Sequence, residues 1–265
     1  MRCTVVGAQG FIGGRLAQLL TAVGELPWTP TKGDPELLER DLGVLWYCAG
    51  NSADYDQRPF DTVAAHTCLI SEIIRAGNFE RLIYCSSTRL YDGLSQTHVD
   101  ESTPLVFNSS DPRRVFDLSK ALGENLTLAR SEGRGVVARL SNVFNGHSGS
   151  PDFLSEWLKK ATLSREITLD TSPDIQRDYI HLDDAVTSLK AIAGGSGIYN
   201  VACGQLISNG EIAEIFKSEG WSVTFTGLAE MQPPPSVSVE RLLALGIKAR
   251  SVKDVLREFL RGLKF

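Results

Sequence analysis

Short apolar runs alternate with amphipathic segments along the first two-thirds of the chain. Helical spacing predicts helices over about 11–23, 59–75 and 112–130, and a weak strand near LPWTP lies before the second of these. The apolar runs that read as buried strands are CTVVG, VLWYCAG, LIYCSS and GVVARL. Continuous apolar strands that alternate with helices are typical of a parallel sheet covered on both faces. The pattern therefore predicts an α/β fold, a Rossmann-like doubly wound parallel sheet.

The pattern changes after Asn142. The strands become short and scattered, and helices separate them: ITLD, DYIHL, IYNVA and SVTFTG. We expect residues 1–142, with returning segments near 178–203, to form the sheet domain. Residues 143–265 should mostly form a small C-terminal lobe beside it.

Three glycines, Gly7, Gly10 and Gly13, lie between the first strand and the first helix in VVGAQGFIGGRL. A tight turn, a close approach of backbone to a pyrophosphate and the N–H groups of a helix N-terminus all favour bare backbone here. The spacing is G-x-x-G-x-x-G, and the alternative is a glycine-rich turn that binds nothing. We interpret the loop as a dinucleotide site.

The second strand ends in WTPTKGD, which puts Thr31 and Lys32 where an acidic residue would hold the ribose of NAD. A lysine beside a hydroxyl suits the 2′-phosphate of NADP, although Lys32 also fits a solvated turn. We therefore expect NADP as the cofactor, with NAD as the alternative.

Composition excludes several classes of partner. The net charge is −5 with no basic cluster, which argues against nucleic acid and against an anionic membrane surface. No apolar stretch approaches the ~20 residues needed to span a bilayer. The five cysteines are scattered and the four histidines lack zinc spacing, so we expect reduced thiols, no metal and a cytoplasmic location.

Six motifs follow one another in a fixed order: GAQGFIGG, YCSSTRLYDG, FDLSK, RLSNVFNG, QRDYIHLDDAV and IYNVACGQLIS. Together they resemble the extended short-chain dehydrogenase/reductase family, the NAD(P)-dependent epimerase/dehydratase group acting on nucleotide sugars. The resemblance implies a cofactor site formed by Gly7, Gly10, Phe11, Ile12, Gly13, Ala49, Gly50, Lys120 and Val143. It implies a sugar-nucleotide site formed by Ser87, Thr88, Asn142 and Arg177, with Ser87 and Lys120 also catalytic.

The resemblance fails at one catalytic position, because the tyrosine of the family's Y-x-x-x-K motif is Phe116 here. Positions i and i+4 share a helix face, so residue 116 and Lys120 should both face the cleft. Loss of a general acid–base group typically costs about 10²–10⁴ in rate. We favour a Tyr→Phe substitution introduced to trap a complex; natural loss or rerouting of the acid is the alternative, and an ordinary core phenylalanine is a third reading. The missing-acid interpretation predicts that Phe116→Tyr raises turnover at least about tenfold.

Three reactions use this scaffold. Thr88 and Arg89 stand where the family's dehydratases carry an Asp-Glu pair, which argues against dehydration. Lys32 and the short lobe favour an NADPH-dependent reductase of a nucleotide-linked 4-keto-(6-deoxy)sugar. A nucleotide-sugar epimerase with bound NAD is the alternative, and a non-catalytic NADP sensor is a further one. The family also implies a homodimer formed through the helices over 59–75 and 112–130.

Overall fold

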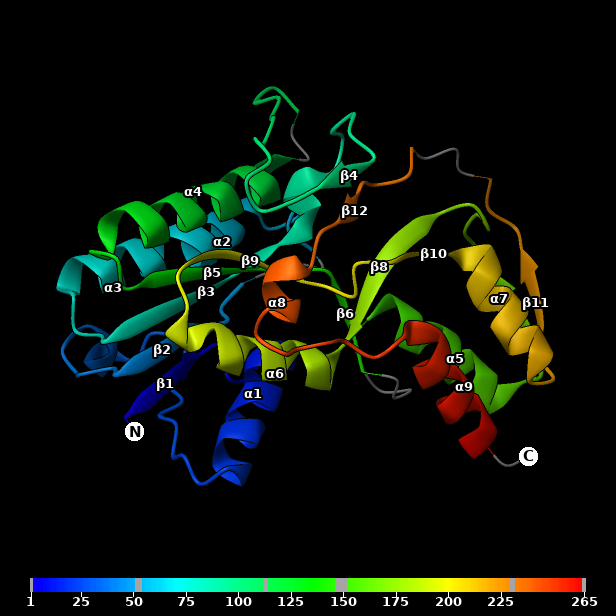
Figure 1. The fold of residues 1–265 in the computed structure, drawn as a ribbon, viewed down its shortest axis with the longest axis horizontal. Helices are drawn as coiled ribbons and strands as arrows, with labels where there is room; N and C mark the ends of the chain where they lie inside the picture. Colours follow the sequence, from blue (N-terminus) through cyan, green and yellow to red (C-terminus); the bar gives the residue numbers. More distant parts are fainter. Residues whose placement is uncertain (1, 51–53, 112–113, 146–151, 229–231, 264–265) are drawn as a thin grey trace.

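A computed structural model describes residues 2–50, 54–111, 114–145, 152–228 and 232–263 of the chain (Figure 1). Its centre is a five-stranded, wholly parallel sheet in the order β1-β2-β3-β5-β9. These strands are β1 (Cys3–Val6), β2 (Val44–Tyr47), β3 (Arg81–Ser87), β5 (Gly135–Leu140) and β9 (Gly197–Val201). The predicted doubly wound α/β fold is confirmed.

Helices cover both faces of this sheet. Alternate side chains of a strand point to opposite faces, so neighbours such as Trp46 and Tyr47 belong to different core clusters. One face is covered by α1 (Phe11–Ala22) and α6 (Leu182–Ala191), and the other by α3 (Leu69–Ala76) and α4 (Val115–Arg130) (Figure 1). Because both faces are buried, the strands carry apolar residues without alternation, which is the signal that the sequence shows.

The predicted strand near LPWTP is reduced to a single parallel bridge between Thr4 and Trp28. Prolines at 27 and 30 flank this bridge, and proline cannot donate to a ladder. A 3₁₀ turn, Pro35–Leu38, then leads to β2. The regular ladder on this side of the sheet therefore ends at β1.

The predicted helix over 59–75 consists of three pieces. It begins as α2 (Pro59–Val63), continues as a π-helical turn (Ala64–Cys68) and ends as α3. π-helical turns inside helices are often found at functional sites. Here the turn carries His66 and Thr67, both of which are buried. The predicted helix over 112–130 begins as a regular α-helix at Val115, and residues 112–113 lie outside the described residues.

A second group of elements builds the lobe. A three-stranded sheet, in the order β10-β8-β6, consists of β6 (Asn142–Phe144), β8 (Gln176–His181) and β10 (Leu206–Ser208). A parallel pair consists of β7 (Glu166–Leu169) and β11 (Ser222–Phe225). With them pack α5 (Phe153–Leu163), α7 (Asn209–Ser218) and α9 (Val252–Gly262), around a core that includes Trp157, Phe216 and Trp221. The strand predicted at IYNVA is β9 and lies in the large sheet, beside β5.

Short elements connect the two groups. A 3₁₀ turn, Thr88–Tyr91, follows β3, and another, Ile192–Gly194, follows α6. Two-residue strands β4 (His98–Val99) and β12 (Ser236–Val237) pair in parallel, and α8 (Glu240–Leu243) contacts β9. The segments after β3 and before α8 therefore lie side by side near the carboxyl ends of the central strands (Figure 1).

Candidate active site at the carboxyl edge of the sheet

The glycine loop joins β1 to α1 with backbone that a side chain would obstruct. Gly7 has a φ of +87°, and a Cβ built on it would lie 2.7 Å from the backbone nitrogen of Ala49. A Cβ on Gly13 would overlap the carbonyl oxygen of Gly7. Gly10 is the N-cap of α1, and neither a side-chain cap nor an acidic residue occupies that end of the helix. The free N–H groups of this first turn, which includes Phe11 and Ile12, suit an anion such as a pyrophosphate.

Lys120 lies against the carboxyl-terminal part of β3. Its Nζ donates a hydrogen bond of 2.8 Å to the carbonyl oxygen of Cys85, and only 6% of the residue is exposed. Burial lowers the pKa of this ammonium to about 8, although the nearby thiols of Cys85 and Cys48 act in the opposite direction. Gly50, at the end of the β2 segment, approaches the same nitrogen: a Cβ there would lie 3.3 Å from Nζ. Lys120 and Ala49-Gly50 are thus brought together, as the resemblance implies.

His66 completes this buried group, although none of the motifs assigns it a role. Its Nδ1 lies 2.9 Å from the hydroxyl of Ser119. Its Nε2 lies 3.1 Å from a Cβ built on Gly50. Burial, together with the charge of Lys120, lowers the pKa of His66 to about 2, so the imidazole is neutral. The π-helical turn, which the amphipathic pattern does not reveal, is what directs His66 towards α4.

Ser87 ends β3 and caps the turn after it. Its Oγ accepts a hydrogen bond of 3.1 Å from the backbone N–H of Arg89. Thr88 donates to the carbonyl of Leu140 over 3.4 Å. Ser87 therefore lies at the carboxyl edge, where ligands bind to open parallel sheets.

Phe116 is 5% exposed, and three residues with polar groups contact its ring. Ring centroids of Tyr55 and His66 lie 5.4 and 5.1 Å from that of Phe116. The guanidinium carbon of Arg89 lies 5.0 Å from the same centroid. Such neighbours support the interpretation of Phe116 as part of the candidate site. Tyr55 and Arg89 were not predicted as site residues, because Tyr55 lies outside the motifs and Arg89 counted only as evidence against dehydration.

The buried carboxylate of Asp117 holds Arg89 in place beside Phe116. Asp117 has no exposed surface, and its two oxygens contact Arg89 Nε at 3.2 Å and Arg114 Nη1 at 2.9 Å. A buried carboxylate shared by two guanidiniums fixes both side chains, since moving either leaves a buried charge less well compensated. Arg89 is therefore anchored against the Phe116 ring.

The predicted substrate residues on the lobe lie across from the sheet. Asn142 begins β6 and donates to the carbonyl of Asp178 over 2.9 Å, while Val143 pairs with Ile180 and packs on the core of the large sheet. Arg177 lies on β8 with its guanidinium carbon 4.6 Å above the ring of Phe153. Its buried Nη1 has no hydrogen-bond partner among the described residues. A buried donor of this kind suits an acceptor on a ligand.

Thr31 and Lys32 lie in an exposed loop beyond the Trp28 bridge, before Gly33 with its φ of +82°. They are therefore placed on the β1 side of the sheet and apart from the group around Lys120. Which dinucleotide they select stays a prediction.

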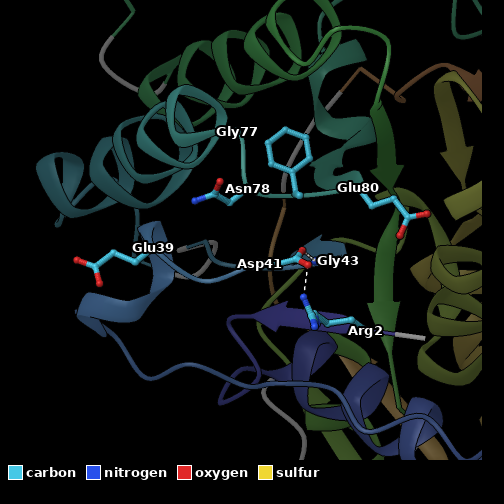
Figure 2. Close-up of a pocket in the computed structure, with 8 residues that line it drawn as sticks. Arg2, Glu39, Asp41, Gly43, Gly77, Asn78 and Glu80 are labelled. Atoms are coloured by element: carbon cyan, nitrogen blue, oxygen red, sulfur yellow. Dashed lines mark hydrogen bonds and ion pairs between the residues drawn. The ribbon is translucent and has the colours of Figure 1, made fainter.

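A second hollow lies at the opposite, amino edge of the sheet (Figure 2). It is lined by Arg2, Glu39, Asp41, Gly43, Gly77, Asn78, Phe79 and Glu80. Arg2 forms an ion pair with Asp41, and both side chains are more than 60% exposed. None of the predicted site residues lies in this hollow.

The described residues contain no helix long and apolar enough to cross a membrane. In the same part of the chain, no group of three or more His, Cys, Asp or Glu side chains is arranged to hold a metal ion.

The model of the family described as "NAD dependent epimerase/dehydratase family" matches residues 44–202. The chain therefore belongs to this family, and the resemblance seen in the motifs is confirmed. No curated protein matches the sequence.

Solved structures share the fold over nearly their whole length. MoeE5 in complex with UDP-glucose and NAD has a TM-score of 0.81 at 17% identity, covering 98% of this chain and 99% of that one. The UDP-glucose 4-epimerase of Thermotoga maritima with UDP-glucose has a TM-score of 0.81 at 15% identity, covering 98% of both chains. RMD from Pseudomonas aeruginosa, complexed with NADPH, has a TM-score of 0.77 at 19% identity and the same coverage.

Proposed function

We propose that this protein transfers hydride between a nicotinamide dinucleotide and a nucleotide-linked sugar, as an NADPH-dependent reductase of a 4-keto-(6-deoxy)sugar. The observation that carries the proposal is the burial of Lys120 against β3 and beside Gly50, which follows β2, the strand next to the one that leads into the glycine loop. Burying a cation is costly unless it is paired and hydrogen-bonded, so a buried lysine of this kind marks a candidate functional site. Ribose hydroxyls of a dinucleotide would be the partners that use this ammonium.

The residues fit such a cofactor. First-turn N–H groups at Gly10–Gly13 would bind the pyrophosphate, and Thr31 and Lys32 the adenosine ribose with its 2′-phosphate. Lys120 would hold the nicotinamide ribose, with Ala49, Gly50 and Val143 against the cofactor. The cofactor itself supplies the hydride, and every other task falls to the chain.

The substrate would lie between the two groups of elements, with residues 1–142 and 178–203 holding the cofactor and most of 143–265 holding the nucleotide sugar. Ser87 would donate its O–H to the sugar oxygen that reacts, and Thr88 and Asn142 would flank the sugar. The unpartnered Nη1 of Arg177 supports a contact with the anionic diphosphate. Residue 116 supplies no proton, which leaves the proton step to another group.

The second candidate is a nucleotide-sugar epimerase with bound NAD. The neighbour named UDP-glucose 4-epimerase and the NAD held by MoeE5 support it, and the exposed position of Lys32 does not separate the two reactions. An epimerase oxidises and re-reduces one sugar, so it gives no net change in cofactor.

One set of measurements separates these functions. We expect calorimetric binding of NADPH, and oxidation of NADPH on dTDP-4-keto-6-deoxyglucose. Retained NAD with interconversion of UDP-glucose and its 4-epimer would favour the epimerase instead. Dinucleotide binding without binding of either sugar nucleotide would favour a non-catalytic NADP sensor. Absence of dinucleotide binding would overturn all three.

Variants of Arg177 test the substrate half of the proposal. We expect Arg177→Ala to weaken sugar-nucleotide binding about tenfold or more, because a hydrogen bond to a charged group is worth about 1.5–3 kcal/mol. Dinucleotide affinity should stay unchanged. Arg257→Ala is the matched control, since Arg257 lies on α9 in an exposed pair with Asp254.

We also propose that the protein is a cytoplasmic homodimer. All five cysteines are free thiols, which fits a reducing compartment. Apolar side chains protrude from the adjoining helices α2 and α4, namely Phe60 at 88% exposure, Leu122 at 50% and Leu118 at 37%. Leu118 and Leu122 share one face of α4, and such a patch suits a symmetric helix–helix contact. Sedimentation of the protein and of Leu122→Asp tests this: the variant should shift a dimer towards monomer.

A further inference from the structure

We infer that Tyr55 is the proton donor that replaces the missing phenol at residue 116, and that Arg89 is the residue that positions it. This inference rests on the proposed function, because it assigns one step of that reaction. It follows the alternative explanation of Phe116, in which the protein naturally lost the tyrosine and another residue took over proton donation. Tyr55 lies outside the six motifs that resemble the family, and Arg89 lies within YCSSTRLYDG, where the resemblance assigns it no role.

The position of Tyr55 beside Phe116 supports this role. Tyr55 stands in the segment between β2 and α2, and its ring lies 5.4 Å from the ring of Phe116, tilted by 57°. Phe116 also contacts His66, which adjoins Gly50 and Lys120. Tyr55, an aromatic residue with a hydroxyl, thus contacts Phe116, which stands where the family's catalytic tyrosine would be.

The direction of the hydrogen bond at Tyr55 also supports this role. Arg89 Nη2 donates to the Tyr55 oxygen over 2.7 Å, and a guanidinium has no acceptor. The phenol proton therefore stays available, and the described residues include no acceptor for it. Tyr47, Tyr84 and Tyr91 differ, since each donates its O–H to a backbone carbonyl.

Arg89 also orders two hydroxyls in the same way. Its backbone N–H donates to Ser87 Oγ at 3.1 Å while its side chain donates to Tyr55. Both oxygens accept from Arg89, which leaves both O–H groups to donate outwards. Two such donors are what a carbonyl oxygen needs while it becomes a hydroxyl.

The charge of Arg89 supports the same role. Arginine remains a cation in proteins, and the guanidinium carbon of Arg89 lies 4.5 Å from the centroid of the Tyr55 ring. Asp117 holds it from the other side at 3.2 Å, so its place does not depend on a ligand. A fixed cation stabilises the negative charge that develops on the phenol oxygen as the proton leaves.

Tyr179 is a second phenol near the predicted substrate residues, and its hydroxyl lacks a hydrogen-bond partner among the described residues. It is only 2% exposed and packs in the core of the lobe, 6.1 Å from the ring of Phe144. Burial raises the pKa of this phenol to about 12, which makes it a poor acid at neutral pH. The geometry thus favours Tyr55.

A bound reduced nicotinamide would supply the hydride, with its electron pair, that forms the new C–H bond at the sugar carbonyl carbon. Tyr55 would supply the proton: the electrons of the breaking carbonyl π bond would take it from the Tyr55 O–H. Oxidised nicotinamide, the sugar alcohol and a phenolate beside Arg89 would result, and water would reprotonate the phenolate.

Steady-state rates of four proteins test the inference, with NADPH and dTDP-4-keto-6-deoxyglucose as one probe and NAD and UDP-glucose as the other. We expect Tyr55→Phe to lower kcat about 10²–10⁴-fold with dinucleotide affinity unchanged. Phe116→Tyr alone should change kcat less than about tenfold, because a donor is already present. Adding Phe116→Tyr to Tyr55→Phe should restore most of the lost rate.

Two further variants separate proton donation from a structural role. Arg89→Met should lower kcat and move the pH–rate profile of the remaining activity, whereas Arg89→Lys should recover part of the rate. Tyr199→Phe is the matched control, because Tyr199 also stacks on an arginine, at 4.2 Å from Arg241, and lies in β9 away from the site. It should leave kcat unchanged.

Contrary outcomes distinguish the inference from the proposed function. If Tyr55→Phe keeps its kcat, or the double variant does not recover, Tyr55 is not the donor and the proposed function stands. Turnover in Phe116→Tyr without turnover in the unaltered protein overturns the inference alone. Absence of turnover in both overturns the inference together with the proposed function.

Discussion

The two edges of the central sheet show how different an open hollow and a reactive site are. At the amino edge, the hollow in Figure 2 is lined by exposed side chains such as Arg2 and Asp41, which neutralise each other in water. At the carboxyl edge, Lys120 and His66 are buried, and the pKa of each is lowered by burial. The amino edge is recognised by its hollow, and the carboxyl edge by its buried titratable groups. Buried titratable groups with shifted pKa values are the better indicator of a reactive site, because such a site must hold its groups away from water.

Matched glycines at the two edges give the largest expected contrast. Gly7 and Gly77 both have positive φ, but a Cβ on Gly7 meets the backbone of Ala49, whereas one on Gly77 meets nothing within 4 Å. We expect Gly7→Ala to lower dinucleotide affinity at least about 100-fold, since the loop must move. Gly77→Ala should cost only the left-handed backbone penalty, about 1–2 kcal/mol of unfolding free energy, with affinity unchanged. Calorimetry and urea denaturation measure the two effects; equal affinities would remove the loop from the site.

Lys120→Met tests the buried cation. Loss of its hydrogen bonds to ribose should lower dinucleotide affinity about 10–100-fold. The folded pKa of about 8 lies below the unfolded value of 10.5, so the unfolded chain binds more protons between them and stability rises with pH in that window. We expect this rise to vanish in the variant. Lys217→Met, on an exposed side chain, is the control, and a rise kept by Lys120→Met would contradict the assignment.

His66→Gln should produce a smaller effect, on the acid side. The folded pKa of His66, about 2, is below its ordinary 6.5, so the unfolded chain binds the extra proton as pH falls from 6.5. The protein should therefore lose stability between pH 7 and 4, and the variant should lose less of it. Urea denaturation across this range measures the difference. Exposed His98→Gln should follow the unaltered protein; if His66→Gln does so too, burial of the imidazole is not the cause.

Asp41→Asn, in the hollow of the amino edge, should have the smallest effect. Exposed ion pairs contribute about 0–1 kcal/mol, and the amide still accepts from the Gly43 N–H, which the Asp41 carboxylate contacts at 3.0 Å. We expect unfolding free energy to change by less than about 1 kcal/mol and dinucleotide affinity not to change. A large loss of affinity would show that this edge takes part in binding.

The parts of the site that could be predicted are those fixed by local backbone chemistry. Gly7, Gly10 and Gly13 are visible in the sequence because a turn before a helix N-terminus requires bare backbone. The i, i+4 spacing of Phe116 and Lys120 likewise predicts a shared helix face. The bridge at Trp28 shows the limit, since flanking prolines weakened an apolar run that resembled a strand.

The sequence by itself determined the alternation of buried strands and helices, the glycine loop and the family, because each rests on spacing along the chain. Tertiary structure decided which side chains meet. His66 reaches Gly50 through a π-helical turn, and Arg89 joins Ser87 to Tyr55 across segments 34 residues apart. Neither contact has a period that a sequence pattern could reveal. They depend on parallel strands ending at one edge, where segments distant in the chain are brought within hydrogen-bonding distance.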